Sequence, residues 1–73
     1  MEIFNLKSEF ITLIQLLKTM RIAQSGGEAQ MLVEDEQVIL NGKIEHRKRA
    51  KLRDGDVVEF MNKRIVIKKQ ENT

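Results

Sequence analysis

Two different hydrophobic patterns occupy the first third of the chain. Ile3, Phe4 and Leu6 form a short apolar run that indicates a strand. From residue 9 onward, apolar residues recur every three or four positions, which is the spacing of one face of a helix. The pattern therefore predicts a helix of about 12 residues, with Ser8 as its N-cap. Its apolar stripe consists of Phe10, Leu13, Ile14, Leu17 and Met20.

A second helix has a clearer start. Ser25 is followed three residues later by Glu28, an arrangement in which the serine hydroxyl caps free helix amides and the glutamate reaches back. Three consecutive carboxylates at residues 34–36 end this helix, where they oppose the helix dipole. The face that we expect in the core consists of Ala29, Leu32 and Val33.

Beyond residue 37 the pattern changes to strands, which we expect at residues 38–40, 43–45, 57–60 and 65–67. Asn41-Gly42 lies between the first two and is the strongest short-range signal for a hairpin. We expect the chain to fray over residues 68–73. The sequence thus predicts an α+β fold, with two short packed helices followed by a small, mainly antiparallel sheet. The single domain spans residues 1–69, and residues 70–73 form a tail.

Charge is distributed unevenly, although the net charge is only +2. Residues 1–37 carry three cations and six carboxylates, a local net of −3. Residues 43–53 carry six cations and one carboxylate, a local net of +5. Fixed cations neutralise phosphates and release counterions, so this segment predicts a positive patch for an anionic partner. A solvated, charged loop is the alternative interpretation.

Residues suited to catalysis are scarce. The chain has no cysteine and one histidine, His46, which excludes disulfides and thiolate zinc sites and disfavours transition-metal sites. Ser8 and Ser25 fit helix caps better than nucleophiles, and residues 54–56 fit a turn. We expect no enzyme, metal, cofactor or small-molecule substrate. The longest apolar stretch, residues 10–17, is far short of the roughly 20 residues that span a bilayer, so we expect a cytoplasmic protein without membrane contact.

The charge of the second helix and the positions of the aromatic rings limit the kinds of nucleic-acid contact that we expect. The second helix carries four carboxylates and no lysine or arginine, which disfavours insertion into a DNA major groove. The three rings, Phe4, Phe10 and Phe60, all fit core positions, so we expect no base-stacking platform. Contact is expected with the backbone of a folded or double-stranded nucleic acid. The glycine-rich start of the second helix could receive an anion, although a simple helix cap also explains it.

Several motifs combine in the pattern of a known family. Residues 23–29 read Ala-Gln-Ser-Gly-Gly-Glu-Ala, residues 38–43 read Val-Ile-Leu-Asn-Gly-Lys, and residues 55–58 read Gly-Asp-Val-Val. At these spacings the chain resembles the S-four RNA-binding domain, also called the alpha-L motif, over about residues 10–60. The Arg-Lys-Arg run and the length are similar to those of its small stand-alone bacterial members.

The resemblance implies the alpha-L RNA-binding fold and a non-catalytic module for structured RNA, either ribosomal or transfer RNA, with a role linked to translation or the ribosome. Many members carry an arginine where Gly26 stands and a glycine where Glu36 stands. An alternative function is a protein-interaction module, in which the acidic end of the second helix docks on a basic partner such as a ribosomal protein. The implied RNA-binding residues are Ser25, Gly26, Gly27, Lys43, Arg47, Lys48, Arg49 and Lys51.

Overall fold

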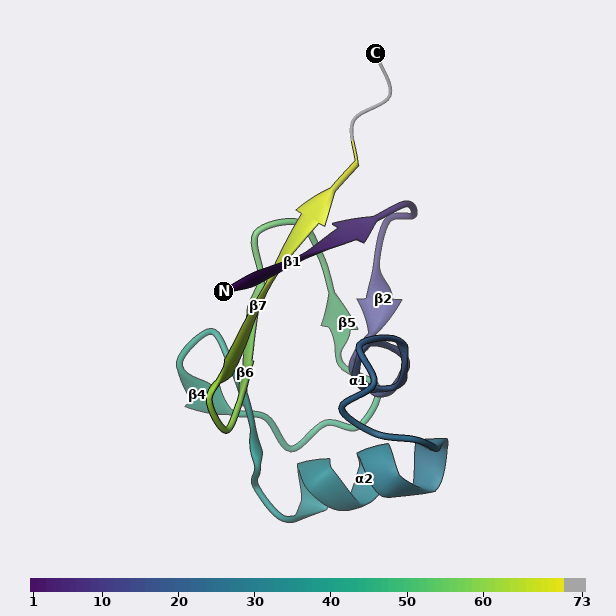
Figure 1. Cartoon of the computed structure of the whole chain (residues 1–73), viewed down its shortest axis with the longest axis vertical. Coiled ribbons are helices and arrows are strands. Elements are labelled where there is room, and N and C mark those ends of the chain that lie inside the picture. Colours follow the sequence, from purple (N-terminus) through teal and green to yellow (C-terminus); the bar gives the residue numbers. More distant parts are fainter. Residues whose placement is uncertain (71–73) are drawn as a thin grey trace.

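The computed structural model describes residues 1–70, and within them the chain forms the α+β fold that the sequence predicts (Figure 1). Five strands form one sheet in the order β1-β7-β6-β3-β4, and β2 and β5 form a separate two-stranded ribbon. The elements in chain order are β1 (Glu2–Leu6), β2 (Ile11–Thr12), α1 (Leu13–Thr19), α2 (Gly26–Glu34), β3 (Val38–Leu40), β4 (Lys43–Ile44), β5 (Lys51–Leu52), β6 (Val57–Phe60) and β7 (Lys63–Lys69).

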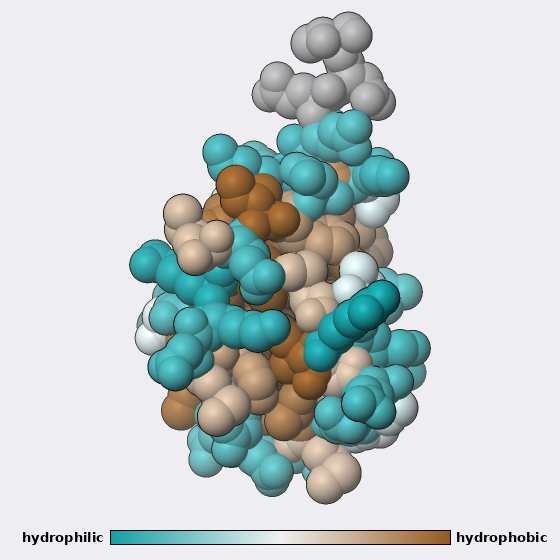
Figure 2. Space-filling model, viewed as in Figure 1, coloured by the Kyte–Doolittle hydropathy of each residue, from teal (hydrophilic) through white to brown (hydrophobic). Residues whose placement is uncertain are grey.

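Alternate strand residues point into one core that the sheet, the ribbon and both helices share. Strand β1 pairs in parallel with β7, whereas the other pairs of the sheet are antiparallel. Outside the core, strips of apolar surface lie between projecting hydrophilic side chains (Figure 2). The largest fully buried side chains are Leu6, Leu13, Leu16, Leu17, Leu52, Ile65, Ile67, Val33, Val38 and Val58.

The first helix begins later than its hydrophobic stripe predicts. Thr12 is its N-cap, with Oγ1 accepting a hydrogen bond from the Gln15 amide at 3.3 Å. The Ser8 hydroxyl instead donates to the Phe10 carbonyl at 2.9 Å, so the prediction of Ser8 as the cap is wrong. The β-branched residues Ile11 and Thr12 pair with β5 as a strand, which is the structure that such side chains favour. Phe10 therefore lies outside the helix, and its side chain is exposed.

The second helix begins as predicted and ends in a left-handed residue. The Ser25 hydroxyl accepts a hydrogen bond from the Glu28 amide at 3.1 Å. At the other end, Glu36 has a φ of +59°, and the amides of Glu36 and Gln37 each donate at 3.1 Å to carbonyls of the last turn. This is the Schellman arrangement, in which glycine is the usual left-handed residue. The positive φ at this position explains why many family members carry a glycine where Glu36 stands.

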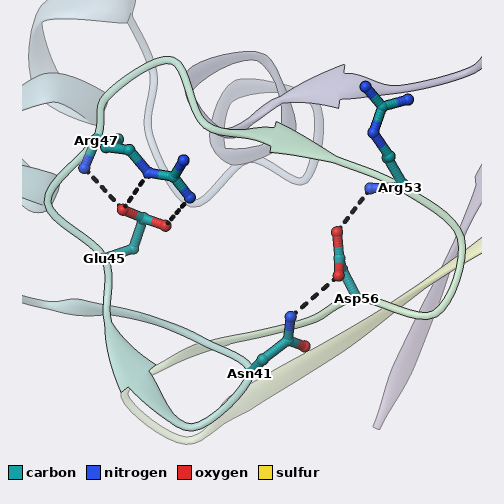
Figure 3. A network of polar contacts seen from close by, with 5 residues as sticks. All are labelled: Asn41, Glu45, Arg47, Arg53 and Asp56. Carbon is teal, nitrogen blue, oxygen red and sulfur yellow. Dashed lines mark hydrogen bonds and ion pairs between the residues drawn. The ribbon is translucent and has the colours of Figure 1, made fainter.

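The predicted hairpin at Asn41-Gly42 joins β3 to β4, and both residues have positive φ, +51° and +86°. The Asn41 side chain also reaches the neighbouring turn. Its Oδ1 accepts from the Val57 amide at 2.8 Å, and its Nδ2 donates to Asp56 at 3.0 Å. The other Asp56 oxygen accepts from the Arg53 amide at 2.7 Å (Figure 3). One asparagine therefore connects the hairpin to the end of the basic segment.

The last strand is longer than the sequence predicts. Lys68 and Lys69 belong to β7, where they pair with Asn5 and Leu6 of β1. The Gln70 amide donates to the Leu6 carbonyl at 2.7 Å, so the backbone is ordered by hydrogen bonds up to residue 70. The rest of the predicted tail, residues 71–73, lies outside the described residues.

We expect Asn41→Ala to lower the free energy of unfolding by about 2 kcal/mol, because it removes two side-chain hydrogen bonds and places alanine at a positive φ. Asn41→Gly removes the same hydrogen bonds without the backbone strain, so it should cost less than Asn41→Ala. Urea denaturation of both variants measures the two contributions. Equal stability of wild type and both variants would contradict the connecting role of Asn41.

Candidate nucleic-acid interface

The basic segment is held against the core by its own small apolar residues. Ala50 is 4% exposed and Leu52 is fully buried, while Arg49, Lys51 and Arg53 are exposed. The Ala50 carbonyl accepts a hydrogen bond from the Leu13 amide at 2.9 Å, at the first residue of α1. The burial of every second residue therefore leaves a row of three outward cations on a fixed backbone.

A half-buried ion pair shapes the loop that leads into this row. Glu45 accepts three hydrogen bonds from Arg47, from the amide at 2.9 Å, from Nε at 3.2 Å and from Nη2 at 3.0 Å (Figure 3). The Glu45 side chain is only 11% exposed, whereas Arg47 remains 75% exposed. These hydrogen bonds lower the pKa of Glu45 and raise the pKa of Arg47. Arg47 is thus fixed by a carboxylate below it while much of its guanidinium faces solvent.

The acidic end of α2 pairs with the same loop. Glu34 lies 2.5 Å from Lys48 Nζ, and Glu36 lies 3.0 Å from His46 Nε2. The sequence did not indicate either contact, because the partners are separated by ten or more residues and the loop had to be placed first. Lys48 brings opposite charge to a carboxylate that opposes the helix dipole. Both contacts hold the basic loop at the C-terminal end of α2.

The predicted site residues do not form one cluster. Ser25, Gly26 and Gly27 lie at the N-terminal end of α2, and a helix of nine residues is about 13 Å long. Among residues 1–70, no hydrogen bond or ion pair connects this end to the basic loop. Lys43 lies exposed on the edge strand β4. The start of α2 and the basic loop are therefore two parts of the candidate interface, and their binding of RNA stays a prediction.

Lys48 and Arg49 line an open hollow of about 470 Å³ between the helices. Gln15 of α1 and Gln30 of α2 contribute amide groups to its wall, and Thr12 and Ile14 complete it. Amide side chains offer both hydrogen-bond donors and acceptors beside the two cations. This is where the basic loop, α1 and α2 meet.

The space around residues 26 and 27 does not require glycine at either position. A Cβ at Gly26 would meet nothing within 4 Å, and one at Gly27 would meet only the Ser25 hydroxyl at 3.9 Å. The arginine of many family members therefore has room at the position of Gly26. Whether these glycines admit an anion stays a prediction.

Sequence reasoning left two residues of this surface out of the predicted site. Arg53 was counted in the positive segment but not among the RNA-binding residues, and Phe10 was assigned to the core. In the structure, Lys51 Nζ lies 4.9 Å and Arg53 Cζ lies 5.5 Å from the centroid of the Phe10 ring. The alternation of basic and apolar residues over 49–53 was the available signal, since it is the period of a strand with one buried face.

Other kinds of site find little support in the described part of the chain. Residues 1–70 contain no group of three or more histidine, aspartate or glutamate side chains that could hold a metal ion. No helix among them is long and apolar enough to cross a membrane.

Comparison with known proteins agrees with the fold and the motifs. A family model described as the S4 domain matches residues 4–68, so the chain belongs to the S4 domain family, the S-four domain that its motifs resemble. The match extends the resemblance beyond residues 10–60 to include β1 and β7. One relative is the probable ribosome maturation protein RlbA of Bacillus subtilis (strain 168). It is 40% identical over 56 residues, which cover 77% of this chain and 79% of that protein.

We expect Glu45→Gln to lower the free energy of unfolding at pH 7 by about 1 kcal/mol, because the amide replaces a charged acceptor of three hydrogen bonds. The pKa of Glu45 is lowered from 4.5. Its stabilisation is therefore fully present above pH 4.5 and is lost as the pH falls through the lowered pKa. The difference between wild type and variant should shrink below pH 4.5 in denaturation curves recorded across pH. A difference that stays constant down to pH 2 would contradict this origin.

Proposed function

We propose that this chain is a non-catalytic module that binds structured RNA and acts in ribosome maturation, with ribosomal RNA as its target. The observation that carries the proposal is the row of exposed cations, Arg49, Lys51 and Arg53, which alternate with the buried residues Ala50 and Leu52 in and beside β5. Membership of the S4 domain family and the similarity to the probable ribosome maturation protein RlbA support the same function.

The arrangement suits phosphate contact. Each cation that neutralises a phosphate releases counterions, which drives binding entropically. Because the backbone of the row is already ordered, binding needs to order only the ends of the side chains. The amides at the start of α2 offer a second contact for phosphate, about one helix length from Lys48. Two contacts at a fixed separation favour a folded RNA, in which phosphates keep fixed distances.

The protein-interaction alternative stays a prediction, and the structure favours it less than the sequence did. Two of the three carboxylates that would dock on a basic partner, Glu34 and Glu36, pair with Lys48 and His46. A basic partner would first have to displace these two side chains. We therefore do not propose this function.

We expect the triple variant Arg49→Gln, Lys51→Gln, Arg53→Gln to bind fragments of ribosomal RNA at least tenfold more weakly than wild type at 0.1 M salt. Each lost phosphate contact removes about 0.7–0.9 from the slope of log affinity against log salt, so that slope should become shallower by about two to three. Fluorescence anisotropy across a salt series measures both quantities.

The matched control changes the same number of charges outside this row, with Arg21→Gln, Lys63→Gln and Arg64→Gln, where all three side chains are exposed. This control should keep most of the wild-type affinity and slope. Duplex DNA of equal length serves as the competing ligand, and ribosomal RNA should bind at least tenfold more tightly. If the two triple variants lose affinity equally, or DNA binds as well as RNA, the proposed interface is wrong.

A further inference from the structure

The Phe10 ring occupies an unusual position on the β2–β5 ribbon. It directly precedes Ile11, which pairs with Leu52, so continuation of the same register places Phe10 opposite Arg53. Phe10 is 36% exposed, with Lys51 Nζ and Arg53 Cζ within 5.5 Å of its ring centroid. Asp56 binds the Arg53 amide while the Arg53 side chain points away from that carboxylate (Figure 3). The two cations are thus directed towards the ring by the strand that carries them.

An open hollow of about 570 Å³ adjoins this ring, a volume within the range of small-molecule sites. Phe10 and Ile11 supply apolar wall, and Asn5, Ser8 and Gln15 supply polar groups. Amide and hydroxyl groups can both donate to and accept from the edge of a nucleobase. Lys7 and Lys18 add positive charge at its wall.

This hollow adjoins the interface proposed above. Gln15 lines both it and the smaller hollow of Lys48 and Arg49, so the two hollows are neighbours beside α1. The nearby carboxylate of Glu9 lies 2.7 Å from Lys69 Nζ, and this contact lowers the pKa of Glu9. Its charge is thus compensated within the chain. The surface from Arg49 to Phe10 therefore remains favourable to a polyanion.

We propose that Phe10 is a stacking platform for one unpaired nucleotide of the bound RNA. The base lies on the ring and enters the hollow, and Lys51 and Arg53 hold its flanking phosphates. This inference rests on the proposed function and adds a preference to it: the target carries a bulged or splayed nucleotide beside its folded part. Stacking is independent of base identity, so the amides of Asn5 and Gln15 are the groups that would select among bases.

The contacts of the free protein prepare this arrangement. A cation over a ring face is attracted by the ring quadrupole, which keeps the ring and both cations in place before RNA arrives. On binding, the phosphates attract Lys51 and Arg53 outward and the ring face becomes available to the base. A scattered exposed apolar residue needs no explanation. A ring with two convergent cations beside a polar hollow is a more specific arrangement.

The test compares two hairpins from ribosomal RNA that differ only in one bulged 2-aminopurine. Wild type should bind the bulged hairpin at least fivefold more tightly than the fully paired one, the lower end of the range for stacking of one base on an aromatic ring. It should also quench the fluorescence of the 2-aminopurine. Phe10→Leu should abolish both the preference and the quenching, while its affinity for the paired hairpin stays within twofold of wild type.

Two further variants separate stacking from packing. Phe60→Leu makes the same chemical change in β6, away from the hollow, and should keep the preference for the bulge. Phe10→Trp keeps a ring and should retain or increase the preference and the quenching. Thermal unfolding of each variant reports whether the fold is intact.

The outcomes distinguish the stacking role of Phe10 from the proposed RNA-binding function of the chain. Equal binding of both hairpins by wild type, or a preference that survives Phe10→Leu, overturns the platform and leaves the proposed function standing. A partner protein that binds wild type but not Phe10→Leu, with RNA binding unchanged between them, would also overturn it and assign the hollow to protein contact. Wild type that binds neither hairpin overturns the proposed function and the platform together.

Discussion

The burial of Ala50 and Leu52 is the constraint on which the candidate interface depends. A run with six cations in eleven residues would ordinarily be a solvated loop. Here two apolar side chains enter the core, and the Ala50 carbonyl bonds to the start of α1. The charged neighbours of these residues must then face outward. The burial of two uncharged side chains thus determines where the neighbouring positive charges lie.

The ion pairs around the basic loop have a positional role more than an energetic one. Exposed pairs such as Lys48 with Glu34 contribute little to stability. Their effect is to keep the loop beside α2, so that a polyanion meets cations already near their binding positions. The same carboxylates weaken the positive potential of the loop, which limits non-specific adhesion to any polyanion. Selectivity and affinity are therefore balanced within one small group of charges.

Local signals predicted most of the fold, and contacts between distant residues account for what they missed. The capped start of α2 at Ser25 and the Asn41-Gly42 hairpin were readable because both depend on short-range chemistry. The apolar stripe from Phe10 matched a helix, yet Ile11 and Thr12 joined β5, because tertiary strand pairing overrode a pattern that fits both structures. The pairing of Glu34 with Lys48 required the loop to be placed in space, which periodicity cannot do.

The parallel pairing of β1 with β7 makes residues 2 and 65 neighbours, and this has a consequence for how the chain folds. Closing so long a loop lowers the chain entropy before the stabilising contacts between its ends have formed. Contacts of high sequence separation therefore slow folding. Leu6 and Ile67, on the two paired strands, reach the core only when both ends of the domain are present. The helices and the hairpin can form early, but the sheet is completed last. During synthesis, the domain therefore reaches its native state only after β7 has left the ribosomal exit tunnel.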